Sequence, residues 1–236
     1  MKKLKIITFI LALSGLAPFL QSCLGDDDNR REKLLICTIN VSDAEKNRFY
    51  LTQDNGQTLF PSDIRYLGNY KPVDGQRAFV TCNFLDEKAA GYDYNIRILK
   101  IVNILTKDIK KLNKENEAEI GDDKINQTYM WISKDRKYLT IEYQFYGTYR
   151  KDKKHLLNLV INEKKKDITS SAIKDYIELE FRHNAHGDTS GEAINGYVSF
   201  KLNEIKDQMK GKKGLKIRVN TIYNGEKTYE VNFPPS

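Results

Sequence analysis

Apolar and polar residues alternate with a period of two in several parts of this 236-residue chain, and this alternation restricts the fold more than any other feature. Between Tyr138 and Phe145, apolar side chains occupy every second position, and the same pattern recurs over 176–182 and 214–220. Such alternation places apolar side chains on one face of a strand and polar side chains on the other, as in antiparallel sheets with one buried face. We therefore predict an all-β fold.

Two turn sequences agree with this prediction. The segment 54–56, Asp-Asn-Gly, lies between the apolar runs 49–51 and 58–60, and Asn-Gly at 224–225 follows the alternating run that starts at Gly214. Asn-Gly between two strands favours a tight hairpin turn, because both central residues of that turn take positive φ. We expect a β-hairpin at each place.

A polar segment over 112–124, with the sequence LNKENEAEIGDDK, divides the chain and is predicted to be a linker or a short surface helix. Before it, residues 34–111 hold about five strand-like runs, which suit a small barrel of the oligonucleotide/oligosaccharide-binding (OB) type. After it, residues 125–236 hold about seven short strands, which suit an immunoglobulin-like β-sandwich. Apolar residues at helical spacing within 202–209 predict one short helix that packs on the sandwich.

The N-terminus has the pattern of a secretion signal. Three lysines precede residues 6–20, which carry no charge but are shorter than the roughly 20 apolar residues that span a membrane. The next residues, Leu-Gln-Ser-Cys, match the bacterial lipobox, in which the cysteine thiol carries diacylglycerol, with palmitate as a typical acyl chain. We predict that residues 1–22 are removed, that Cys23 anchors the protein to a membrane, and that 23–33 form a lipidated flexible tether.

Three adjacent carboxylates follow the predicted anchor at Asp26, Asp27 and Asp28, and like charges in a row stay solvated. Their placement resembles the acidic export signal of Bacteroidota-type lipoproteins. It predicts an outer-membrane lipoprotein exposed on the cell surface, with a periplasm-facing anchor as the alternative. Loss of the signal removes three lysines and no acidic residue, which lowers the formal net charge from +7 to +4. This location and this small charge argue against a nucleic-acid partner.

Two cysteines remain once Cys23 is assigned to lipid. Cys37 and Cys82 each lie in an apolar, strand-like run. A disulfide could persist outside the cytoplasm, whereas buried cysteine also behaves as a small apolar residue. We favour two separate thiols in the core and keep a disulfide as the alternative.

The whole layout resembles the NigD-like lipoproteins, which combine a lipid anchor, an OB-type barrel and a β-sandwich. Short stretches at 54–59, 72–77, 104–107 and 130–141 carry the resemblance, which extends over essentially the full chain. Its most specific piece is Arg-His-Asn-Ala-x-Gly-Asp at 182–188, called the signature segment below. The family is named from a bacteriocin-associated locus, so the resemblance implies an immunity role and establishes no molecular activity.

The signature segment is the candidate site. Its candidate ligand-binding or structural residues are Arg182, His183, Asn184, His186, Gly187 and Asp188. Two histidines and an aspartate are metal-ligand types, but an extended strand would direct residues 183 and 186 to opposite faces, and no further ligand is evident. We favour a polar turn in which asparagine, glycine and aspartate adopt special backbone angles. We predict no metal, no cofactor and no catalytic residue.

No nucleophile motif accompanies these residues. Ser199 and His155 are isolated in the sequence, Glu180 is expected on an exposed strand face, and Trp131 is assigned to core packing in preference to a sugar-stacking surface. We therefore predict a non-catalytic envelope lipoprotein that binds a protein or glycan partner, with bacteriocin immunity as the role that the resemblance implies. A carbohydrate-binding accessory lipoprotein and a metal-dependent hydrolase that uses 183–188 are the alternatives. The oligomeric state is left open.

Overall fold

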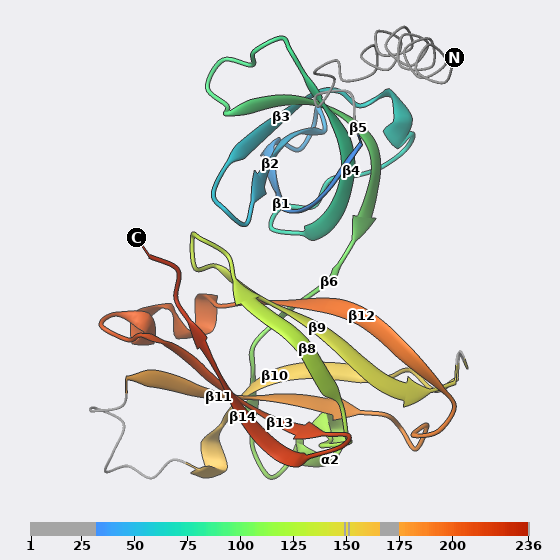
Figure 1. Cartoon of the computed structure of the whole chain (residues 1–236), viewed down its shortest axis with the longest axis vertical. Helices are drawn as coiled ribbons and strands as arrows, with labels where there is room; N and C mark the ends of the chain where they lie inside the picture. The colour runs from blue at the N-terminus through green and yellow to red at the C-terminus, as the bar shows by residue number, and fades with distance from the viewer. Residues whose placement is uncertain (1–31, 149, 151, 166–174, 236) are drawn as a thin grey trace, which may run out of the picture.

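The computed structural model describes residues 32–148, 150, 152–165 and 175–235, and these residues form a barrel and a sandwich (Figure 1). The predicted fold class is therefore confirmed. The signal segment, Cys23 and the aspartates 26–28 lie outside the described residues. In the part of the chain that is described, no helix is both long and apolar enough to cross a membrane.

The N-terminal domain is a closed five-stranded barrel with neighbours in the order β1-β2-β3-β5-β4. Its strands are β1 (Lys33–Asp43), β2 (Arg48–Gln53), β3 (Thr58–Asp63), β4 (Arg77–Leu85) and β5 (Tyr94–Asn103), and the 3-10 helix η3 (Arg65–Leu67) follows β3. Alternate residues such as Ile39, Leu51 and Ile98 are fully buried inside the barrel. The barrel interior is therefore a packed hydrophobic core.

Both remaining cysteines belong to this core. Cys37 and Cys82 are fully buried and their thiols are free, in agreement with the interpretation of two core thiols. Burial disfavours the thiolate, so it raises the pKa of both groups, that of Cys82 to about 11. These thiols are therefore poor nucleophiles.

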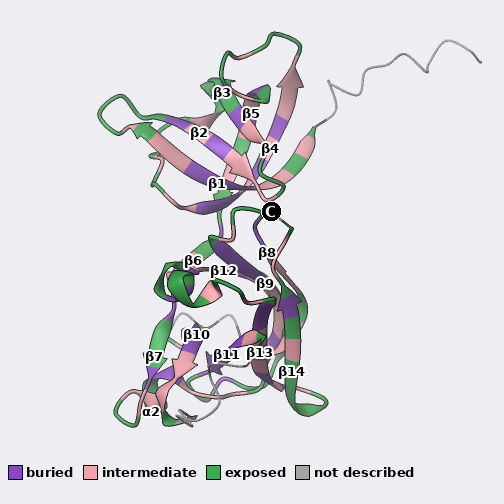
Figure 2. Cartoon of the chain, turned by 90° about the vertical axis from the view of Figure 1, so that its left-hand side faces the viewer, coloured by how far each residue is buried: buried purple, intermediate pink, exposed green. Residues whose placement is uncertain are grey.

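Two sheets form the C-terminal sandwich. One is β6 (Leu105–Asp108), β12 (Glu192–Lys201), β9 (Tyr138–Gly147) and β8 (Asn126–Ile132); the other is β14 (Gly225–Asn232), β13 (Gly214–Thr221), β11 (Tyr176–Asn184), β10 (Leu156–Asn162) and β7 (Lys110–Leu112). Three pairs, β6–β12, β7–β10 and β11–β13, are parallel. Leu139, Phe181 and Phe200 lie in the core between the sheets, and Figure 2 shows buried residues within both domains.

The predicted boundary between the domains is wrong. Residues 105–108 and 110–112 were assigned to the barrel, but as β6 and β7 they pair with β12 and β10 of the sandwich. The segment 112–124 is not a linker: it contains the short helix α2 (Glu117–Ile120), which was the other possibility predicted for it, and it buries both Leu112 and Ile120 against the sandwich. Its few apolar residues are buried despite its polar composition. The domains therefore meet at Ile104.

The predicted helix and hairpins occur where expected but differ in detail. Residues 203–209 form a 3-10 helix, η5 (Asn203–Met209), whose Ile205 is fully buried in the sandwich core. Hairpins connect β2 to β3 and β13 to β14, yet among the residues of these turns only Gly56 and Gly225 have positive φ. The expected turn, with two residues at positive φ, is therefore replaced by turns in which glycine alone supplies that conformation.

A buried ion pair of the barrel contacts the sandwich at the domain junction. Arg77, at the start of β4, is 0% exposed, and its Nη2 lies 2.7 Å from the carboxylate of Asp54. The guanidinium lies over the ring of Tyr138 in the sandwich, 5.2 Å from its centroid. From the same domain, Trp131 Nε1 donates to Asp54 Oδ2 at 2.6 Å. Trp131 is thus half-buried at the domain junction, not in the core as predicted.

Replacement of Arg77 tests this junction. We expect Arg77→Met to lower the free energy of unfolding by about 3–5 kcal/mol, since it leaves the Asp54 carboxylate in a mostly buried position without its cation. Arg97→Met is the matched control, because Arg97 pairs with Asp63 at a position where the arginine is 37% exposed and water screens the pair. Urea unfolding of the two variants measures the difference; equal losses would contradict a special role for Arg77.

Candidate functional site

The signature segment ends β11 and leads into the turn before β12. Its first residue, Arg182, is buried and pairs with Glu180, with Nη2 2.6 Å from Oε2. Asn162 Nδ2 donates to the other carboxylate oxygen at 2.9 Å. The prediction that Glu180 lies on an exposed strand face is therefore wrong. Its carboxylate is buried and balances the charge of Arg182. Arg182 also donates to the carbonyl of Gly121 at 3.3 Å, which brings the segment 117–124 against the strand.

The next signature residues hold that segment in place. Asn184 Nδ2 donates to two carbonyls of α2, at 3.1 and 2.9 Å, and so satisfies main-chain groups of a helix that is only one turn long. Asp123 closes the contact from the other side: its amide donates to the carbonyl of His183 at 2.8 Å, and its carboxylate accepts the amide of Ala185 at 2.7 Å. These signature groups are therefore committed to packing.

His183 belongs to a hydrogen-bonded chain that the sequence did not reveal. Its Nδ1 lies 3.2 Å from the carbonyl of Lys124, and its Nε2 lies 2.8 Å from Nδ1 of His155. His155 Nε2 in turn lies 3.3 Å from Oδ2 of Asp188. His155 is isolated in the sequence and lies just before β10. Because β10 and β11 pair with Leu157 opposite His183, this pairing brings His155 to the signature segment.

The partners determine where the protons lie. A carbonyl only accepts, so Nδ1 of His183 carries a proton and Nε2 accepts one from His155. Burial lowers the pKa of His183 to about 4, which keeps the ring neutral in this role. Hydrogen bonds from the amide and hydroxyl of Thr148 lower the pKa of Asp188 and keep it ionised. In this arrangement His155 donates to His183 through Nδ1.

The other histidine of the signature lies apart from this chain. His186 is exposed at a φ of +48°, and its Nδ1 lies 2.7 Å from the carbonyl of Lys154. Gly187 follows with a φ of +75°, so the predicted turn is present, but its positive φ angles occur at His186 and Gly187 and not at Asn184 or Asp188. The three candidate metal ligands, His183, His186 and Asp188, are therefore not brought together. Within the described ranges, no group of three histidine, cysteine, aspartate or glutamate side chains is placed to hold a metal ion.

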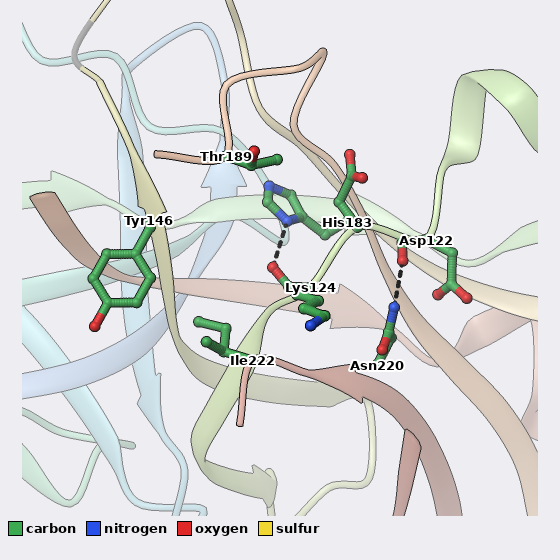
Figure 3. A pocket seen from close by; sticks show the side chains of 8 residues that line it. Asp122, Lys124, Tyr146, His183, Thr189, Asn220 and Ile222 are labelled. Carbon is green, nitrogen blue, oxygen red and sulfur yellow. Dashed lines mark hydrogen bonds between the residues drawn. The ribbon is translucent and has the colours of Figure 1, made fainter. Parts of the chain in front are cut away.

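The His183 ring forms part of the wall of a pocket of about 490 Å³ (Figure 3). The pocket is lined by Asp122, Asp123, Lys124, Tyr146, His183, Thr189, Asn220 and Ile222. Most of these side chains are polar or charged, unlike the apolar lining that is typical of sites for small molecules and cofactors. Asp122 is held by an ion pair with Arg218, and Asn220 Nδ2 donates to the Asp122 carbonyl at 2.7 Å. The pocket is thus built on fixed polar groups.

Family comparisons agree with this architecture. Residues 38–104 match the NigD-like N-terminal OB domain, and residues 108–233 match the NigD-like C-terminal beta sandwich domain. The chain belongs to the NigD-like family. Only residues 105–107, which belong to β6, lie between the two matched ranges, and the resemblance inferred from the sequence is confirmed. No curated protein matches the chain.

Several solved structures share the fold of this NigD-like chain. A protein of unknown function from Bacteroides vulgatus ATCC 8482 is 30% identical, with a TM-score of 0.70 over 87% of this chain and 92% of that one. A protein from Parabacteroides distasonis ATCC 8503 is 29% identical, with a TM-score of 0.69 over 86% and 93%. A NigD-like immunity protein from Bacteroides caccae ATCC 43185 is 16% identical and shows the same fold, with a TM-score of 0.58 over 84% and 92%.

Packing of the signature against the segment 117–124 can be tested at Gly121. A Cβ at this position would lie 2.7 Å from Cβ of Asn184 and 2.8 Å from the carbonyl oxygen of His183. Gly68 also has positive φ, but nothing lies within 4 Å of its Cβ position, so Gly68→Ala controls for backbone strain. We expect Gly121→Ala to cost about 1–3 kcal/mol more unfolding free energy than Gly68→Ala. Similar urea midpoints for the two variants would contradict this contact.

The neutral state of His183 predicts a pH dependence. The unfolded chain binds a proton at this position below its ordinary pKa of 6.5, whereas the folded chain does so only below about 4. This group therefore makes the free energy of unfolding fall as the pH is lowered from 6.5 to about 4. An NMR titration of the His183 ring resonances, with the urea-unfolded chain as reference, measures both pKa values. A folded-state pKa at or above 6.5 would contradict the buried acceptor role.

Proposed function

We propose that this NigD-like protein is a non-catalytic lipoprotein of the cell envelope that binds another molecule at the sandwich pocket, and that it protects the cell against a bacteriocin. One observation carries the proposal: the signature segment contributes the His183 ring to a polar pocket, while Arg182, Asn184 and Asp188 hold the surrounding main chain. The most specific residues of the chain thus build a binding surface.

The same geometry argues against catalysis. His155 and Asp188 resemble the base and the orienting acid of a hydrolase triad, but Nδ1 of His155 faces His183 and not a nucleophile. Within the described residues no hydroxyl or thiol is hydrogen-bonded to either histidine, and the hydroxyl of Ser199 is paired with Thr140 at 2.8 Å. Nucleophilic catalysis by this pair would need a hydroxyl or thiol beside the base. Binding is therefore the better-supported function.

The proposed location comes from the sequence. Lipidation at Cys23 would attach the protein to the outer membrane, and the aspartates 26–28 would direct it to the cell surface. A structure that shares this fold is described as a NigD-like immunity protein, which motivates the proposed biological role. A bacteriocin that arrives from outside meets the cell envelope first, and an anchored binding module with a polar pocket would be placed to bind it there.

Loss of the anchor tests the location. We expect Cys23→Ser to abolish incorporation of an alkyne-tagged palmitate and to release the protein from the membrane fraction, since the serine hydroxyl cannot form the thioether. Cys82→Ser is the control, because this buried thiol is predicted to carry no lipid and its variant should stay labelled. Protease treatment of intact cells then reports surface exposure. Equal labelling of both variants would refute lipidation at Cys23.

The pocket itself is tested by capture and protection. The anchored protein is used to capture partners from solubilised envelopes, and a deletion strain is challenged with spent medium from bacteriocin-producing relatives. We expect Tyr146→Ala with Lys124→Ala to lose the captured partner and the protection, because both side chains line the pocket. Tyr66→Ala, at a 62% exposed tyrosine on the barrel, should retain both. Unchanged capture and protection in the pocket variant would overturn the proposed site.

A further inference from the structure

A second surface lies on the barrel, apart from the sandwich pocket. Tyr50 on β2 and Phe60 on β3 both lie outside the barrel, between the buried residues of their strands. Tyr92, in the loop between β4 and β5, packs on both: its ring centroid is 5.6 Å from that of Tyr50 and 5.1 Å from that of Phe60. These three rings are called the aromatic face. The Phe60 and Tyr92 rings are stacked, with 29° between their planes, so each ring covers part of one face of the other.

The aromatic face is partly open to solvent. Phe60 is 36% exposed, and Tyr50 and Tyr92 are half-buried. The barrel core is filled by other residues, so these rings do not serve its packing. Exposed aromatic clusters of this kind mark interaction surfaces in soluble domains.

The place of the rings on the barrel suggests which ligand they bind. In OB-type barrels, the face of strands 2 and 3 and the loop between strands 4 and 5 bind oligosaccharides or oligonucleotides.

An unsatisfied polar group lies beside the rings. Asn95 on β5 pairs with Phe60 on β3 in a parallel ladder, so the two side chains leave the sheet on the same side. Asn95 is only 5% exposed, yet within the described chain no donor reaches its Oδ1. A buried amide oxygen normally has a hydrogen-bond partner. A ligand hydroxyl that displaces the covering rings slightly would supply one.

Charge distinguishes the two ligand classes. Residues 33–104 contain nine lysines and arginines against eight aspartates and glutamates. In the loop 86–93, which carries Tyr92, three acidic residues accompany one lysine. Arg97, on the neighbouring strand, is already paired with Asp63 at 2.6 Å. Polyanion binding requires a groove of unpaired basic side chains, and the near balance of acidic and basic residues around this face does not favour one. An uncharged ligand that is rich in hydroxyl groups fits it better.

We propose that the aromatic face of the barrel binds an oligosaccharide, with a pyranose ring packed against the exposed part of the stacked Phe60–Tyr92 pair and a sugar hydroxyl donated to Asn95 Oδ1. Aromatic rings match the apolar C–H face of a pyranose, and tyrosine hydroxyls match its rim. The inference deepens the proposed function by naming a ligand class. It rests on the exported location and not on the sandwich pocket.

The test uses the anchored protein in detergent on an array of neutral and acidic oligosaccharides, followed by calorimetric titration of the best-bound glycan. We expect Phe60→Ala with Tyr92→Ala to weaken binding at least tenfold, and Tyr66→Ala to leave it unchanged. Asn95→Leu should weaken binding about fivefold or more without lowering the urea midpoint, since it removes an unsatisfied buried oxygen. If Asn95 served only the folding of the barrel, its replacement would not weaken glycan binding while leaving the urea midpoint unchanged.

Three results would overturn the proposal: no glycan bound by the unaltered protein, full affinity in the Phe60/Tyr92 variant, or tighter binding of a 20-nucleotide oligothymidine than of any glycan. Urea unfolding of each variant verifies that the barrel remains folded. Capture of an envelope partner through Tyr146 and Lys124 is measured separately. Failure of glycan binding with intact capture removes this inference alone, and loss of capture with intact glycan binding removes the sandwich site alone.

Discussion

The buried pair Arg77–Asp54 is the contact through which barrel and sandwich acquire one arrangement. A fully buried guanidinium needs partners for its charge, and here a barrel carboxylate, the hydroxyl of Thr38 and the ring of Tyr138 supply them, while Nε has no partner among the described residues. Because Asp54 also accepts the Trp131 indole N–H, the same carboxylate couples both domains. The aromatic face and the sandwich pocket are thereby held on one two-domain unit.

The sandwich also contains buried, mutually neutralising charges, and they lie at the signature segment. Arg182 and Glu180 neutralise each other in a buried site, and Arg218 holds Asp122 on the segment that covers them. These paired charges hold the segment 117–124 against β11, and that segment supplies three of the eight residues that line the pocket. Polar residues at such density would normally indicate chemistry. Here each is matched by a partner, so the cluster shapes a surface.

Sequence patterns predicted the two β domains because alternation and turn residues are local. They failed at the boundary because Leu112 and Ile120 are two apolar residues in a polar segment, and their burial depends on a sheet formed by distant strands. The site was predicted in part: the signature segment was located, and its polar turn occurs. His155 was missed because it lies 28 residues from His183, and only the β10–β11 pairing brings them together.

By itself, the sequence determined the class of fold, the family resemblance and the hairpin positions, since period-two alternation and glycine turns act within a few residues along the chain. Tertiary structure alone decided what the distinctive residues do. It turned Trp131 from a core residue into a junction donor, buried Glu180, and separated His186 from His183. The physical reason is that strands remote in sequence bury these side chains and supply their hydrogen-bond partners. Which groups are charged, and where their protons lie, depends on those neighbours, and no local sequence pattern specifies them.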